Sequence, residues 1–199
     1  MRQQDLPAIG APLQGGFFAG VIGINSKLYA QILAPKKHGQ VKLAWHPDEV
    51  NVPGALSFFD GLANTAAMRE AGSPIASWVT DFHLDGHTDW HIPSRDQLEL
   101  LYRHFKPTAR ENFCLSGDNP SSSPVGYAYS LQTPAQTELE TFRKGGEEAF
   151  DDAWYWSSTQ YAGVSGYAWN QFFDYGSQLS YAKSCEARVR AVRLIQLTA

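Results

Sequence analysis

Residues 94–107, SRDQLELLYRHFKP, contain the strongest secondary-structure signal in the chain. Ser94 can accept a hydrogen bond from the Gln97 amide while the Gln97 side chain reaches back, which is the capping box that begins a helix. Lys106-Pro107 ends the pattern. We predict an amphipathic helix here, with an apolar stripe facing a core. The stripe consists of Leu98, Leu101, Tyr102 and Phe105.

Two shorter helices are predicted on the N-terminal side of this segment. Asp60-Gly61 is a turn signal, residues 63–70 read as a helix, and Gly72 closes it. Ser73-Pro74 then has the chemistry of an N-cap followed by a first-turn proline. Its apolar positions recur at helical spacing. They are Ile75, Trp78, Val79 and Phe82.

Strand patterns occupy both ends of the chain, and they decide the fold class. The N-terminal ones are residues 17–24, 27–33 and 40–45, with an Asn25-Ser26 hairpin turn. The C-terminal ones are residues 153–158, 166–174, 178–183 and 187–195. Strands at both ends with helices between them predict an α+β fold whose antiparallel sheets join the N- and C-terminal strands.

We expect a single domain over residues 1–199, because 43% hydrophobic residues can form one sizeable core. Residues 1–50 supply the N-terminal strands and 51–107 the helices. Residues 108–152 form long loops with one short helix, which begins at Thr133-Pro134 and ends at Gly145-Gly146. Residues 153–199 form the C-terminal strands.

The charge, the cysteine content and the hydropathy of the chain argue against nucleic-acid binding, a disulfide framework and membrane insertion. The net charge is −4 and no basic cluster occurs, so we expect no nucleic-acid partner. Cys114 and Cys185 are too few for a disulfide framework, and we expect two reduced, partly buried thiols. The N-terminus does not resemble a signal peptide, and the apolar run at 17–24 is too short to cross a bilayer. We therefore expect a soluble chain without membrane insertion.

Aromatic residues gather near the C-terminus, with ten between Trp154 and Tyr181. Side chains alternate along a strand, so these rings cannot all face one side. We expect Trp156, Trp169 and Phe173 in the core and Asn170, Phe172 and Asp174 on the outside. Exposed tyrosines beside amides and glycines are typical of binding surfaces. The proposed ligand-binding residues are Tyr161, Tyr167, Asn170, Phe172, Asp174, Tyr175, Gln178 and Tyr181.

Four segments carry a family resemblance. Residues 85–98, DGHTDWHIPSRDQL, resemble the segment G-x-x-D-W-x-[LI]-P-[ST]-x-[DE]-[EQ]-L of a bacterial and phage domain family. Residues 154–161, WYWSSTQY, and 188–193, RVRAVR, resemble its closing elements Y-W-S-S-T and R-x-R-x-V-R. Residues 58–65, FFDGLANT, resemble its D-G-x-x-N-T piece. That family also supplies the C-terminal domain of the collagen-like adhesin Lcl, and the likeness covers residues 55–195.

The resemblance implies a C-type-lectin-like fold, related to formylglycine-generating enzymes, and a role in ligand display. Adhesins, phage tail proteins and the variable proteins of retroelements share this fold. In the variable proteins, the late strands carry the diversified positions, and these correspond here to Asn170, Phe172, Asp174, Tyr175, Gln178 and Tyr181. The N-terminal segment at 15–20 is similar to lead-in strands of prophage-encoded members.

Other chemistries are less well supported by the sequence. Formylglycine generation needs a reactive cysteine pair, which Cys114 and Cys185 do not resemble. His83, His87 and His91 are spaced as on one helix face, but Gly86 and Pro93 argue against that helix, so we expect no metal. Calcium stays an alternative because of Asp81, Asp85 and Asp89, although the D-x-D-x-D-G spacing is missing.

Two sets of charged residues are also candidates for a role in catalysis or ligand binding. The acids Glu147, Glu148, Asp151 and Asp152 could serve glycoside cleavage, but a solvated turn explains them better. Arg188, Arg190 and Arg193 are expected to pair with carboxylates or to stack on tryptophans.

The predicted function is therefore a non-enzymatic attachment protein of a virion, at its tail or on the particle surface. It would bind a host-surface glycan or protein, contact other virion proteins and need no cofactor. Whether it forms a homo-oligomer is left open. The first alternative is a structural virion component that packs on neighbouring subunits, and the second is a polysaccharide-cleaving enzyme.

Overall fold

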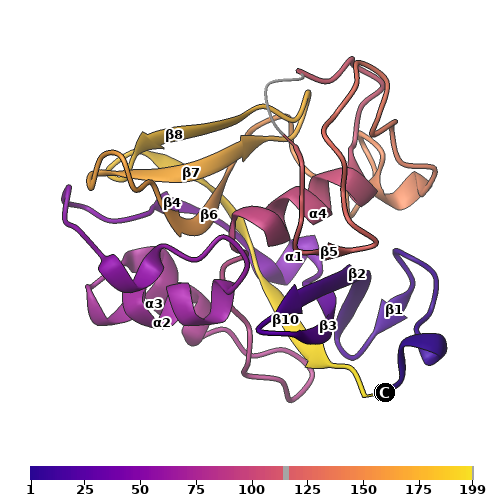
Figure 1. Ribbon diagram of the computed structural model, residues 1–199, viewed down its shortest axis with the longest axis horizontal. Helices are drawn as coiled ribbons and strands as arrows, with labels where there is room; N and C mark the ends of the chain where they lie inside the picture. The colour runs from indigo at the N-terminus through magenta and orange to yellow at the C-terminus, as the bar shows by residue number, and fades with distance from the viewer. Residues whose placement is uncertain (114–116, 199) are drawn as a thin grey trace.

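The computed structural model describes residues 1–113 and 117–198, in which the strands form two sheets of five strands each (Figure 1). The first sheet has the order β1 (Pro12–Leu13), β2 (Gly16–Ile24), β3 (Lys27–Leu33) and β10 (Val192–Gln196), and β5 (Ser122–Ser123) pairs with β2. The second has the order β4 (Gln40–Ala44), β9 (Glu186–Arg190), β6 (Trp154–Gln160), β7 (Tyr167–Phe172) and β8 (Gln178–Ala182). All pairings are antiparallel except that between β6 and β9.

The helices are α1 (Lys36–Gly39), α2 (Gly61–Glu70), α3 (Pro74–Thr80) and α4 (Arg95–Phe105), with short 3-10 turns at Gln3–Asp5, Pro53–Ala55 and Glu140–Phe142. The capping box of α4 is confirmed: Ser94 Oγ accepts from Gln97 N at 3.3 Å, and Gln97 Oε1 accepts from Ser94 N at 2.8 Å. The expected turn at Asp60 is in fact the N-cap of α2, since its carboxylate accepts from Ala63 N at 3.0 Å.

Helix α4 lies between the two sheets and contacts both (Figure 1). The predicted apolar stripe of α4 is buried against aromatic rings of the second sheet and of the loop that precedes β6. Tyr102 packs edge-on to Phe173 at 5.5 Å between ring centroids, and Phe105 stacks on Phe142 at 4.3 Å. This packing fixes the side of β6 and β7 that faces inward.

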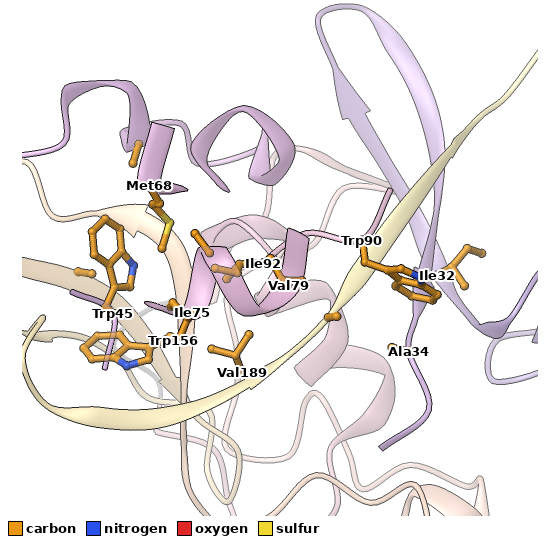
Figure 2. Close-up of a cluster of buried hydrophobic side chains, with 14 of the residues drawn as sticks. Ile32, Ala34, Trp45, Met68, Ile75, Val79, Trp90, Ile92, Trp156 and Val189 are labelled. Atoms are coloured by element: carbon orange, nitrogen blue, oxygen red, sulfur yellow. The ribbon is translucent and has the colours of Figure 1, made fainter. Parts of the chain in front are cut away.

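A second core cluster joins α2 and α3 to strands of both sheets. Figure 2 shows the indoles of Trp45 and Trp156 at one end of this cluster and Trp90 beside Ile32 at the other. All four side chains are buried. Trp45 also donates from its indole N–H to the Ser157 carbonyl at 2.9 Å, so the cluster includes a directional contact.

The α+β class is confirmed, and β10 does join the N-terminal strands in one sheet. The finer assignment to a C-type-lectin-like fold stays a prediction. The predicted final strand, residues 187–195, is two strands in different sheets, β9 and β10. They separate at Ala191, whose N–H donates to Gly39 and whose carbonyl accepts from Ala34. Hydrogen bonds to residues before and at the end of α1 thus fix the point at which the chain passes from one sheet to the other.

The helix predicted from Thr133 to Gly145 is wrong over most of its length, because residues 133–139 are not helical and only Glu140–Phe142 form a 3-10 turn. Their backbone groups bond to distant partners instead. The Pro134 carbonyl accepts from the Asn112 amide at 2.9 Å and from Lys106 Nζ at 3.3 Å, and Thr137 N donates to the Lys106 carbonyl. A long-range lysine and amide therefore replace the intrahelical bonds that the local sequence favours.

None of the helices in the described part of the chain has the length and apolar character that crossing a membrane requires. Cys185 is a free, partly buried thiol, as expected. Cys114 lies outside the described residues.

Candidate ligand-binding face

Partly exposed rings form a continuous row on the side of the second sheet that faces away from α4. Trp154 and Phe172 are opposite each other on β6 and β7, with ring centroids 5.0 Å apart. Phe172 contacts Tyr175 at 4.7 Å, and Tyr175 contacts Phe113 at 6.2 Å. We call this row, together with Leu179 and Tyr181 of β8, the aromatic face. Phe113, Leu179 and Tyr181 are 50%, 47% and 53% exposed, so the face is open to solvent.

At one end of the aromatic face, an ion pair between Arg110 and Asp174 lies beside the Tyr175 ring. The Arg110 guanidinium lies 4.9 Å from the centre of the Tyr175 ring and pairs with the Asp174 carboxylate, which is buried. The Asp174 carbonyl also accepts from the Thr108 hydroxyl at 2.8 Å. These contacts orient the Tyr175 ring, which reduces the entropy lost when a ligand packs on it.

Two hollows open on the face and share Leu179. The smaller, of about 280 Å³, is lined by Trp154, Asn170, Leu179, Tyr181, Glu186 and Ala187. The larger, of about 440 Å³, includes Arg110, Phe113, Leu131 and Tyr175 in its lining. A further hollow of about 720 Å³ lies where the two chain ends meet, and its lining includes no aromatic residue from the described part of the chain. Exposed rings and concavity therefore coincide on the aromatic face.

Phe172, Tyr175 and Tyr181 lie on this face as predicted, but Asn170, Asp174 and Gln178 are not exposed. Asn170 is 3% exposed because it sits in β7, an interior strand, between Trp156 of β6 and Leu179 of β8. Asp174 is held by Arg110 and Thr108 in the turn after β7. Gln178 lies opposite Gln171 on the side that faces α4. The expectation that these three side chains point freely into solvent is wrong.

Tyr161 and Tyr167 belong to a different surface. Tyr161 packs edge-on to Trp169 at 5.3 Å, and the Tyr167 carbonyl accepts from Tyr161 N. Trp169 is only partly buried, which corrects its expected place in the core, whereas Trp156 and Phe173 are fully buried as predicted. The Arg95 guanidinium lies between the rings of Trp169 and Phe58, at 5.0 and 4.9 Å. The eight predicted residues are therefore not one site.

Sequence reasoning did not assign Trp154, Phe113, Leu179 or Glu186 to the face. For Trp154 a signal was available, because a strand residue that alternates with Tyr155 must share the face of its cross-strand partner Phe172. Phe113 lies in a loop with no periodic pattern, and only tertiary contacts bring it to Tyr175.

Two of the four acids before β6, Glu148 and Asp151, have a structural role, whereas Glu147 and Asp152 are exposed as the solvated turn predicts. Asp151 pairs with Lys36 Nζ at 2.8 Å and with Arg188 Nε at 2.7 Å, and Glu148 pairs with buried Arg190. Arg193 pairs with Asp89 at 2.7 Å and lies over the Trp90 ring. The predicted pairing of the three arginines is confirmed, and Glu148 and Asp151 are already engaged by cations.

The three histidines do not form a helical stripe, since residues 82–94 contain no helix. His91 is buried and its backbone pairs with Val192, whereas His83 is exposed. Among the described residues, no three histidine, cysteine or acidic side chains are placed to hold a metal ion.

The segments that carry the family resemblance meet in the interior. The Asn64 amide accepts from Ser57 N at 3.0 Å, donates to the Ser57 carbonyl at 2.7 Å and reaches Ser158 and Thr159 of β6. Thr65 Oγ1 accepts from Ile92 N at 3.1 Å. A Cβ on Gly61 would lie 2.2 Å from Gln97 Oε1, so only glycine fits beside the capping box. These motifs join α2, β6 and α4, and of the residues they contain only Trp154 belongs to the aromatic face.

We expect Asn64→Ala to lower the free energy of unfolding by about 1–3 kcal/mol, because it leaves partly buried backbone groups of Ser57 without their partner. Urea unfolding followed by tryptophan fluorescence measures this. The matched control is Gln132→Ala, which removes an exposed amide and should change stability by less than about 0.5 kcal/mol. Equal stability of the two variants would contradict the structural role of the motif.

Comparison with known proteins gives one positive result. The model of the family described as the Lcl C-terminal domain matches residues 37–193. A search of curated proteins finds no match. The matched range contains both core clusters in large part and every residue of the aromatic face.

Proposed function

This chain belongs to the Lcl C-terminal domain family, an adhesin-like family, and from that membership we propose that it is a non-catalytic attachment protein. Its ligand is a glycan or protein on a host surface, bound through the aromatic face. The observation that carries the proposal is the row of partly exposed rings beside two hollows. Aromatic anchors in concave sites supply most of the binding energy in many interfaces.

Removing two rings of the aromatic face tests this function. We expect Tyr175→Ala combined with Tyr181→Ala to weaken attachment to host cells by about 10–100-fold, because both rings are truncated at the ligand contact. Attachment is measured with fluorescently labelled protein at increasing concentrations. The double variant should keep its fold, since neither ring is fully buried.

The control for this test is Tyr127→Ala. Tyr127 is 81% exposed but lies in the loop around β5, away from the aromatic face. It should attach like the wild type. If the double variant binds host cells as tightly as Tyr127→Ala does, the aromatic face is not the attachment surface.

We also propose that the protein is carried on a phage particle, at its tail or elsewhere on its surface. The support is the similarity of its N-terminal segment to prophage-encoded relatives. Mass spectrometry of purified particles, induced from a host that carries the gene, should detect the protein. Its absence from intact particles would refute this location without affecting the attachment proposal.

A structural role in the particle is the second candidate, and one surface favours it. Leu56, Phe58, Phe59 and Leu62, close together in the chain, are 42%, 40%, 37% and 52% exposed, and Phe58 contacts Trp169. Apolar side chains gathered in this way often mark a protein interface. Limited proteolysis and labelling of assembled particles distinguish the roles: a structural component has this apolar surface and the aromatic face covered by neighbouring subunits, and an attachment protein has the aromatic face accessible.

A further inference from the structure

We propose that the smaller hollow of the aromatic face, which Trp154, Asn170, Leu179, Tyr181 and Glu186 line, binds one uncharged pyranose residue. This inference rests on the proposed attachment function and narrows its ligand to a neutral glycan. The chemistry of the lining groups carries it: two aromatic rings, an amide and a single carboxylate.

Two aromatic side chains that line the hollow, Trp154 and Tyr181, each contact another ring that fixes their position. Trp154 packs against Phe172 at 5.0 Å, and Tyr181 lies 6.4 Å from the buried Trp156 ring. The π face of an aromatic ring carries partial negative charge, and the C–H groups on one side of a pyranose carry partial positive charge. A sugar can therefore pack flat on either ring without any group of formal charge.

The lining of the hollow includes the amide of Asn170. Asn170 is 3% exposed, and its Oδ1 has no hydrogen-bond partner within the described residues. Asn170 pairs across the ladder with Leu179, so its side chain is on the same side of the sheet as the hollow. Buried polar groups that lack a partner are uncommon and costly. A sugar hydroxyl that reaches this amide, with modest rotation of the side chain, would satisfy it.

Charge at the rim selects against acidic sugars. Glu186 supplies a carboxylate that can accept from a second hydroxyl, and the residues that line the hollow include no lysine or arginine. Lys42 pairs with Glu186 at 3.3 Å, but both side chains are 58% exposed, so the pair is weak and can yield to a ligand. A sulfate or carboxylate on the sugar would meet Glu186 and find no cation in the lining.

Size limits the occupant to one ring. A volume of about 280 Å³ is just below the range of about 300–1,000 Å³ that is typical of sites for drug-sized ligands. The larger hollow begins at the shared Leu179, so a second sugar residue could extend toward Tyr175.

The test titrates the isotope-labelled full chain with methyl glycosides of glucose, galactose, mannose and N-acetylglucosamine, followed by NMR. We expect at least one glycoside to saturate with a dissociation constant of the order of 1–10 mM, with shifts at Trp154 and Tyr181. The uronic acid that corresponds to the best hexose should bind about tenfold more weakly, and Glu186→Gln should reduce that difference. Trp154→Ala should weaken binding about tenfold.

Controls separate a lost contact from a lost fold. Tyr167→Ala removes an exposed ring outside the hollow and should bind like the wild type. Trp154→Phe keeps the packing on Phe172 and should bind better than Trp154→Ala. Unchanged amide spectra away from the hollow show that each variant is folded.

The inference is overturned if no glycoside saturates below about 50 mM. It is also overturned if the uronic acid binds as well as its hexose, or if Trp154→Ala binds like the wild type. In those cases, attachment that still depends on Tyr175 and Tyr181 would leave the proposed function standing with another ligand. Attachment that does not depend on them would refute the proposed function itself.

Discussion

A Glu148→Ala variant is expected to lose about 3–5 kcal/mol of unfolding free energy, because it leaves the Arg190 guanidinium buried without its carboxylate. Arg190 is 1% exposed and donates to the Ala34 carbonyl at 2.9 Å, to the Glu148 carbonyl at 2.6 Å and to the Glu148 carboxylate. Burial already lowers the pKa of Arg190 to about 10. Chemical denaturation at neutral pH measures the loss.

Two further variants show that the loss comes from this pair. Glu147→Ala removes the exposed neighbouring carboxylate and should cost less than about 0.5 kcal/mol. Arg190→Met combined with Glu148→Ala should cost less than the sum of the two single substitutions, because no buried charge is left unpaired. If Glu148→Ala is as stable as Glu147→Ala, Glu148 is not structural and becomes a candidate for acid–base chemistry again.

Acidification should destabilise the protein through His91. Burial lowers the pKa of His91 from 6.5 to about 4, so the unfolded chain takes up a proton over this range while the folded protein does not. Stability is therefore fully present above pH 6.5 and is lost as the pH falls toward 4. The full shift corresponds to about 3 kcal/mol.

Comparing His91→Gln and His83→Gln with the wild type isolates the contribution of His91 protonation to the pH dependence of stability. Burial raises the pKa of Asp96 and Glu99, and these carboxyl groups act in the opposite direction because the folded protein binds their protons first. His91→Gln should therefore lose about 2–3 kcal/mol less than the wild type between about pH 7.5 and 4.5. The control His83→Gln, at an exposed position, should follow the wild-type curve. Parallel curves for His91→Gln and the wild type would refute the assignment.

Much of the fold was predictable because local chemistry and burial agree. The three helices between the terminal strands begin where Asp60, Ser73 and Ser94 cap them; the caps at Ser73 and Ser94 were predicted, whereas Asp60 was interpreted as a turn. The hairpin between β2 and β3 turns at Asn25 and Ser26, both of which have positive φ, as the Asn-Ser step indicates.

The errors occur where distant contacts override local preference. Residues 133–139 have helix-start chemistry, yet Lys106 and Asn112 bind the Pro134 carbonyl and keep the chain open. The last strand pattern is continuous in sequence, yet Ala191 divides it between two sheets through its bonds to Gly39 and Ala34. Neither partner can be read from the residues nearby.

In the candidate site too, local patterns predicted some features and distant contacts decided the others. Strand alternation correctly separated Phe173 and Gln171, which point toward α4, from Phe172, which points away. Alternation cannot say how much of the outer side is covered, and this is why Asn170 was misjudged. Its burial depends on the neighbouring strands, and the surroundings of Leu179 depend on where the loop that carries Phe113 lies, because both residues line the larger hollow.

By itself, the sequence determined the α+β class, the family, the capped helices and the side of each strand on which an aromatic residue lies, because caps and side-chain alternation act over a few residues. Only the tertiary structure decided which rings stay exposed, which carboxylates are neutralised by buried arginines, and that Asn170 lines a hollow. Those properties arise from contacts between segments that are far apart in the chain, and no local pattern encodes them.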